Sequence, residues 1–259
     1  MPRVDYDQIA HLYDEPIRDH AVDTNLLAFL DERPDLDRST VRVLDVGCGT
    51  GKQLTADRAR LPGALLVGVD RFRGMLRIAG RRGPGIGWVQ GDGAHLPLAS
   101  TAFDYATSQF SYQHIAGRES FVREIYRVLS PGGRFVMLNI DPWSMTNWAI
   151  YQYFPEAFER DLIDFVPGEA LAELMQETGF VDVRIERQAR IQRQDLAEFL
   201  AYVADRHRTS QLMVISVEAY RAGLVRLRRD VDAAGDGEAS IDSEACLLTI
   251  SGDRPASHR

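Results

Sequence analysis

Residues 43–51, VLDVGCGTG, place a carboxylate and a run of alternating glycines in one short stretch. Asp45 lies in an apolar run typical of a buried strand, and Gly47, Gly49 and Gly51 follow it directly. Glycine loses more conformational entropy on folding than other residues, so a backbone this rich in glycine indicates a tight turn or a close approach. A strand, such a loop and then a helix present backbone N–H groups to a ligand. The stretch therefore predicts a ligand-binding loop.

Two loops that bind phosphate groups do not fit this spacing. The P-loop pattern G-x-x-x-x-G-K-[ST] fails because three residues separate Gly47 from Gly51, and because Lys52 is followed by Gln53. The dinucleotide pattern G-x-G-x-x-G fails because Lys52 stands where its third glycine is required. A third pattern, acidic-x-G-x-G-x-G, is matched in full.

Two further carboxylates and a histidine lie near the ends of later strands. Asp70 ends the apolar run 65–70, where a carboxylate can accept hydrogen bonds from both hydroxyls of a ribose. Asp92 follows the run 87–91, and His114 lies in SYQHI after the next apolar run. The carboxyl ends of parallel strands meet at one edge of a sheet, so we expect these side chains around one crevice. His114 is the candidate to orient or deprotonate an acceptor, and its alternative role is to cap a helix or fill a pocket wall.

The elements that must position these side chains alternate between valine-rich runs and helical patterns, which predicts an α/β fold with a mostly parallel sheet. Helical periodicity is clear in ESFVREIYRVL, where Phe121, Ile125 and Val128 share one apolar stripe. The predicted strands are 41–46, 65–70, 87–91, 103–108, 134–140, 181–187 and 246–250.

The glycine loop, the aspartate at position 70, and the segments GDGAHLPL, FDYATSQFSYQHI and EIYRVLSPGGRFVMLN follow one another at the intervals of a known family. On these motifs the chain resembles the class I S-adenosylmethionine-dependent methyltransferases, and within them the small-molecule branch that includes ubiquinone/menaquinone-biosynthesis enzymes. The resemblance covers roughly residues 5–190. It implies a Rossmann-like, doubly wound, seven-stranded sheet with helices on both faces and a helical cap. It also implies S-adenosyl-L-methionine as the cofactor and transfer of a methyl group to a small molecule by in-line displacement (EC 2.1.1.-).

The resemblance also assigns roles to individual residues. The glycine loop would lie along the methionine part of the cofactor, Asp70 would bind the ribose, and Asp92 would face the adenine amino group. The full set expected to bind the cofactor is Asp45, Gly47, Cys48, Gly49, Gly51, Asp70, Arg71, Asp92, Gly93, Gln109 and Tyr13. The set expected to line an apolar or aromatic acceptor site is Tyr6, Tyr112, Gln113, Trp143 and Trp148, with His114 as the catalytic residue. For the two N-terminal tyrosines, a plain amphipathic helix is the alternative.

Two segments fall outside the alternation of strands and helices, and we expect them to build a pocket over the sheet or, alternatively, to be ordinary core helices. The expected parts are a helical cap (1–40), a cofactor-binding core (41–193) with an aromatic-rich insertion (141–166), a helical insertion that contributes to the substrate pocket (194–240), the last core strand (241–250) and a flexible tail (251–259).

The composition of the chain disfavours some classes of binding partner. The 259 residues carry a formal net charge of −8 without a cluster of basic residues, which disfavours nucleic acid. The two cysteines indicate neither a disulfide framework nor a metal site. Neither a signal-peptide pattern nor an apolar run long enough to span a bilayer is present, so we expect a soluble cytoplasmic protein without a membrane partner. A monomer or homodimer is the default expectation.

Three other functions stay open. The chain could be a non-catalytic S-adenosylmethionine-binding regulator, or a methyltransferase acting on RNA or protein. Against the latter, SQFS stands where an Asn-Pro-Pro-Tyr-type motif would follow the fourth strand. A nucleotide-linked oxidoreductase is the third alternative.

Overall fold

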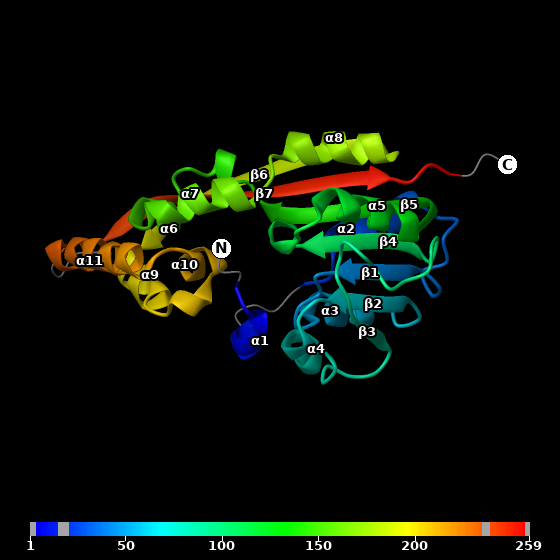
Figure 1. Ribbon diagram of the computed structural model, residues 1–259, viewed down its shortest axis with the longest axis horizontal. Coiled ribbons are helices and arrows are strands. Elements are labelled where there is room, and N and C mark those ends of the chain that lie inside the picture. Colours follow the sequence, from blue (N-terminus) through cyan, green and yellow to red (C-terminus); the bar gives the residue numbers. More distant parts are fainter. Residues whose placement is uncertain (1–3, 15–20, 235–238, 257–259) are drawn as a thin grey trace. The chain divides into compact units, whose positions relative to one another are not determined.

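The computed structural model describes residues 4–14, 21–234 and 239–256. In these residues seven strands form one sheet in the order β3-β2-β1-β4-β5-β7-β6 (Figure 1). β1 pairs in parallel with β2 and β4, β2 with β3, and β4 with β5. The predicted α/β class and the seven strands are confirmed. The strands are β1 Arg42–Val46, β2 Leu65–Asp70, β3 Ile86–Gln90, β4 Phe103–Gln109, β5 Leu129–Ile140, β6 Val181–Asp195 and β7 Ser240–Asp253.

The last strand in sequence, β7, runs antiparallel to β5. Arg254 donates its backbone N–H to the carbonyl of Gly133 at 2.8 Å, and Asp141 donates to the carbonyl of Cys246 at 2.9 Å. Residue numbers therefore rise along β5 in the direction in which they fall along β7. The sheet is mixed but mostly parallel, and β7 lies between β5 and β6.

Three strands are longer than the sequence predicts. β6 continues to Asp195 and β7 begins at Ser240, where the prediction had 181–187 and 246–250. The second half of β6 is exposed on both faces, so it shows no apolar alternation that would reveal a strand. β5 begins at Leu129 instead of 134, opposite an irregular register between Phe103 and Tyr105.

The chain divides into two compact units, and each has its own core. One unit, which we call the core unit, comprises Asp5–Asn139, Gly168–Glu186 and Thr249–Arg259. Its helices are α1 Tyr6–Ile9, α2 Thr24–Glu32, α3 Lys52–Arg60, α4 Arg73–Ala79, α5 Arg118–Val128 and α8 Gly168–Thr178, with 3-10 helices η1 Ala10–Asp14 and η3 Tyr112–His114. The apolar stripe predicted for α5 is buried, including Phe121, Ile125 and Val128.

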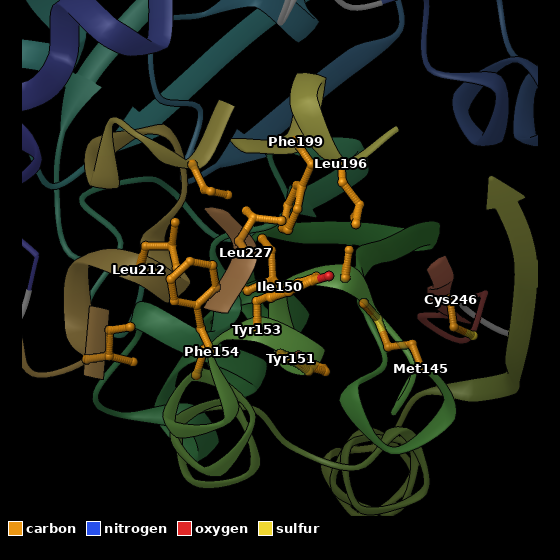
Figure 2. Close-up of a cluster of buried hydrophobic side chains, with 14 residues drawn as sticks. Met145, Ile150, Tyr151, Tyr153, Phe154, Leu196, Phe199, Leu212, Leu227 and Cys246 are labelled. Atoms are coloured by element: carbon orange, nitrogen blue, oxygen red, sulfur yellow. The ribbon is translucent and has the colours of Figure 1, made fainter. Parts of the chain in front are cut away.

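The other unit, which we call the helical unit, comprises Met1–Val4, Ile140–Pro167 and Arg187–Leu248, so both predicted insertions fall within it. Its helices are α6 Ala149–Tyr153, α7 Pro155–Asp164, α9 Leu196–Val203, α10 Ser210–Val214 and α11 Val217–Ala233, with 3-10 helices η4 Pro142–Ser144 and η5 Arg206–Arg208. Figure 2 shows its buried apolar cluster, in which Phe154 is fully buried. Phe154 stacks on Tyr220 with ring centroids 5.9 Å apart, and the absence of a side chain at Gly223 makes room for the phenyl ring.

The segment expected as a flexible tail is partly held in place. Asp253 ends β7, and the guanidinium of Arg254 donates to the carbonyls of Tyr126 at 3.0 Å and Leu129 at 2.6 Å. Arg134 forms an ion pair with Asp253 at 2.6 Å. Residues 257–259 lie outside the described residues.

Candidate functional site

The glycine loop joins β1 to α3 and is fastened to the neighbouring strand. Gly47 and Cys48 both donate backbone N–H groups to the carbonyl of Val69 on β2, at 2.8 and 3.1 Å. All three glycines have left-handed backbone angles, with φ of +84° at Gly47, +53° at Gly49 and +77° at Gly51. Other residues rarely adopt this conformation, which explains the glycines predicted to form the loop.

The three glycines of the loop differ in how much space lies where a side chain would begin. A Cβ atom at Gly47 would lie 2.4 Å from Cβ of Ser111, and one at Gly51 would lie 2.4 Å from Cη2 of Trp88. At Gly49, no atom of the described residues other than its chain neighbours lies within 4 Å of that position. Two of the glycines thus make room for the protein's own side chains, and Gly49 faces open space where a ligand can reach the backbone.

Asp70 ends β2 beside this loop and is 8% exposed. Its Oδ2 accepts from the backbone N–H of Gly49 and its Oδ1 from that of Phe72, both at 2.8 Å. Burial raises the pKa of the Asp70 carboxyl, and these two hydrogen bonds oppose the rise. Each carboxylate oxygen has a second lone pair, so the carboxylate can also accept from two ligand hydroxyl groups.

Asp45, in β1 just before the loop, and Cys48, within the loop, are both nearly fully buried. Burial raises the pKa of the Asp45 carboxyl well above its ordinary value, and the nearby carboxylates of Asp57, Asp23 and Asp70 add to the rise. Oδ1 of Asp45 has no hydrogen-bond partner among the described residues. Burial also raises the pKa of the Cys48 thiol, which supports its role as a small loop residue.

Arg71, Asp92 and Gly93 lie at or beyond the ends of the adjoining strands. Arg71 and Asp92 are exposed. Oδ1 of Asp92 accepts from the backbone N–H of Ala94 at 2.9 Å. A Cβ atom at Gly93 would lie 3.0 Å from the ring of Phe121, so Gly93 allows the turn after β3 to approach α5.

The N-terminal segment brings three of the predicted site residues together. Oη of Tyr6 lies 2.9 Å from Nε2 of His114. The Tyr6 ring also contacts those of Tyr13 and Phe72, with centroids 5.4 and 5.3 Å apart. Phe72 lies two residues after Asp70 and donates its backbone N–H to that carboxylate, which in turn accepts from Gly49, so this aromatic group lies next to the glycine loop and the carboxylate.

Polar contacts with α4 and with the segment that follows it hold the N-terminal segment. The carboxylate of Asp7 accepts from the backbone N–H of Gly74 in the first turn of α4, whose own N-cap Phe72 offers no side-chain acceptor. Asp14 forms an ion pair with Arg82. The N-terminal segment therefore caps a helix of the core unit.

The remaining predicted residues are placed as follows. Gln113 lies in η3 beside His114, and Gln109 ends β4. Tyr112 is 3% exposed and packs on Phe121, and burial raises its pKa to about 12, which supports a packing role. Trp143 and Trp148 belong to the helical unit, where Trp148 packs edge-on to Tyr151.

Comparison with known proteins decides the family. A sequence profile of the methyltransferase domain matches residues 44–137. The demethylmenaquinone methyltransferase of Thermus thermophilus is 33% identical over 178 residues, which cover 58% of this chain and 79% of that protein. The chain belongs to the S-adenosylmethionine-dependent methyltransferases.

Solved structures agree with this fold. The Haemonchus contortus phosphoethanolamine N-methyltransferase 2, in complex with phosphomonomethylethanolamine and S-adenosylhomocysteine, superposes with a TM-score of 0.60 at 20% identity, covering 96% of this chain and 58% of that one. The cyclase SpnF superposes with a TM-score of 0.58 at 20% identity, covering 97% and 94% of the two chains. No helix in the described part of the methyltransferase is long and apolar enough to cross a membrane.

The cofactor of this methyltransferase is S-adenosylmethionine, and the residues around the loop fit it. Gly49 leaves its backbone open to an approaching ligand, Asp70 retains acceptor capacity for a ribose, and Asp45 keeps a buried oxygen that no described residue satisfies. The assignment of individual residues to the cofactor stays a prediction.

Sequence reasoning missed several residues that shape the site. Asp7 and Trp88 belong to no recognisable motif. Asp7 accepts a hydrogen bond from the first turn of α4, and Trp88 fills the space beside Gly51. Phe110 was not missed, because it belongs to the segment FDYATSQFSYQHI that carries the resemblance; it has a left-handed backbone with φ of +51° and is 43% exposed, just after β4. Asn139 could have been noticed as a polar residue in an otherwise apolar strand end.

Proposed function

We propose that the protein transfers the methyl group of S-adenosylmethionine to a small aromatic or apolar molecule that carries an ionisable hydroxyl group. The observation that carries the proposal is the contact of Tyr6 Oη with His114 Nε2 at 2.9 Å, beside Phe72 and the cofactor loop. The Thermus relative is named for demethylmenaquinone, and the reduced form of a quinone has ring hydroxyls. We therefore take a quinol as the first acceptor to test.

The cofactor supplies a methyl group on a positively charged sulfur, so transfer breaks a carbon–sulfur bond whose electron pair stays on sulfur. The acceptor provides the electron pair of the new bond and loses a proton in the overall reaction. The residues of this chain contribute by holding the two molecules in line and by accepting that proton.

Tyr6 and His114 are the groups that accept the proton in this proposal. Oη of Tyr6 lies 2.9 Å from Nε2 of His114, so a proton taken from an acceptor hydroxyl can pass to His114 through Tyr6 when the imidazole accepts at Nε2. The aromatic surface of Tyr6, Tyr13 and Phe72 offers flat apolar contacts that suit a ring-shaped acceptor. The negative formal net charge of −8 and the relative named for a small molecule argue against RNA as the acceptor.

The test measures methyl transfer from isotopically labelled S-adenosylmethionine to reduced 1,4-naphthoquinone, with mass spectrometry to assign the methylated atom. We expect His114→Ala and Tyr6→Phe to lower kcat, by about 10²–10⁴-fold for the histidine, because they remove a positioned base or its relay. Affinity for S-adenosylhomocysteine, measured by calorimetry, should change much less for Tyr6→Phe.

The exposed His207, in the helical unit, provides a matched control, and His207→Ala should leave kcat unchanged. Full activity of His114→Ala at saturating acceptor would contradict the proposed base. If the protein binds the cofactor but methylates no quinol or other small hydroxylated aromatic compound, the proposal fails, and a non-catalytic regulator becomes the better description.

A further inference from the structure

A chain of side-chain hydrogen bonds links the carboxyl end of β5 to His114. Nδ2 of Asn139 donates to Oε1 of Gln113 at 2.9 Å. Nε2 of Gln113 donates to the backbone carbonyl of Phe110 at 2.9 Å and lies 3.3 Å from Nε2 of His114. Tyr6 Oη approaches the same histidine nitrogen. All of these residues belong to the core unit.

The carbonyl of Phe110 fixes the orientation of the Gln113 amide. A backbone carbonyl can only accept, so the Gln113 atom that faces it must be the amide nitrogen. The oxygen then faces Asn139, which must present its own N–H group. Interchanging nitrogen and oxygen of Gln113 would set two acceptors against each other at Phe110. The left-handed backbone of Phe110 belongs to the turn that holds this carbonyl between β4 and η3.

The fixed amide favours one role for the histidine nitrogen, provided that the 3.3 Å contact is a hydrogen bond. Nε2 of Gln113 has only hydrogens to offer, so a hydrogen bond to it requires that His114 Nε2 accept. In a neutral imidazole, the other nitrogen must then carry the proton. The hydroxyl of Tyr6 must donate to the same lone pair rather than accept from it.

We propose that Gln113, held by Asn139 and by the Phe110 carbonyl, is a positioning residue that keeps the proton of neutral His114 on Nδ1. Nε2 is thereby the basic nitrogen, and it faces Tyr6. Gln113 was expected from the sequence to contact the acceptor, and this inference gives it a different role. Its catalytic consequence rests on the proposed function, but the position of the proton is a property of the free protein.

The test is nitrogen NMR of the uniformly labelled full-length protein without cofactor or acceptor, at a pH where His114 is neutral. A protonated imidazole nitrogen and an unprotonated one give distinct pyrrole-type and pyridine-type shifts. We expect the pyrrole-type shift at Nδ1 of His114 and the pyridine-type shift at Nε2. The reverse assignment in the unaltered protein would overturn the proposal, whether or not any acceptor is methylated.

Two variants test the part played by Gln113. Gln113→Glu keeps the shape but presents an acceptor to His114, so the proton should move to Nε2. Gln113→Met removes donor and acceptor, so the two tautomers should approach equal populations. Gln176→Glu adds the same charge at an exposed position of α8 and should leave the His114 spectrum unchanged.

Kinetics supply a second measurement. If the proposed methyl transfer operates, Gln113→Glu should lower kcat by at least tenfold with little change in KM for the cofactor. The nitrogen that faces Tyr6 would then carry the proton and could not accept another. An unchanged His114 tautomer in a folded Gln113→Glu variant would overturn the positioning role. A changed tautomer with unchanged kcat would retain it and count against the proposed base.

Discussion

The glycine loop permits a sharp separation of stability from cofactor binding. Gly49→Ala forces an alanine into the left-handed region, at a cost of about 1–2 kcal/mol in free energy of unfolding, and its methyl group enters open space. Gly51→Ala has the same backbone cost and also places a methyl group 2.4 Å from Cη2 of Trp88. Overpacking of that kind adds about 1–3 kcal/mol, so the total loss is about 2–5 kcal/mol.

The binding effects should have the opposite order. The methyl group of Gly49→Ala occupies the space where the cofactor must approach the backbone, so affinity for S-adenosylhomocysteine should fall by about 10–100-fold, equivalent to about 1.4–2.8 kcal/mol. Gly51→Ala should lose less affinity for S-adenosylhomocysteine than Gly49→Ala, when affinity is calculated for the folded fraction of the protein. Chemical denaturation gives the stabilities, and calorimetry gives the affinities.

A third variant checks the cause assigned to the instability of Gly51→Ala. Trp88→Phe removes the ring carbon that meets the new methyl group, so in that background Gly51→Ala should cost only the backbone share of about 1–2 kcal/mol. The reasoning would be refuted if Gly49→Ala destabilised the protein as much as Gly51→Ala, or if Gly49→Ala bound S-adenosylhomocysteine with unaltered affinity.

Three further outcomes are expected. Burial raises the pKa of Asp57 to about 6, so between about pH 4 and pH 6 the folded state holds a proton that the unfolded chain has released, and the free energy of unfolding falls as the pH rises. Asp57→Asn should remove up to about 3 kcal/mol of the difference in stability between pH 4 and pH 7, measured by chemical denaturation. An unchanged difference would disprove this assignment. Asp7→Ala removes the cap at Gly74 and should cost about 1 kcal/mol and speed proteolysis of the N-terminal segment, whereas equal cleavage rates would count against the cap. Phe154→Ala should lower the free energy of unfolding by about 3–5 kcal/mol, measured by denaturation, yet change affinity for S-adenosylhomocysteine less than threefold. A loss of both stability and cofactor affinity would show that cofactor binding depends on the core of the helical unit.

The sequence was sufficient for the strands that are buried on both faces. The sequences of β1 and β2 are apolar runs because most of their residues are buried, and their observed bounds differ little from the predicted ones. The second half of β6 could not be found in this way, since its exposed residues make strand and loop look alike. β7 was shortened in the prediction because polar residues such as Asp242 and Glu244 interrupt its apolar run.

The candidate site was predictable where local chain geometry dictates residue type. Left-handed angles explain the glycines of the loop, and the end of β2 explains Asp70. Contacts between distant segments were not predictable. Neither the meeting of Asn139 with Gln113 nor the cap that Asp7 supplies to α4 leaves a pattern in the sequence, because each depends on the completed fold.

The place of β7 in the sheet has a consequence for biosynthesis. β6 has no strand neighbour until β7 is made, because β7 lies between it and β5. On a ribosome the first five strands can pair as they emerge, whereas β6 must wait for the chain to pass through α9, α10 and α11. During this interval the nascent protein therefore exposes the edges of β5 and β6 that β7 later pairs with, and unpaired edges of this kind are where a chaperone can prevent aggregation.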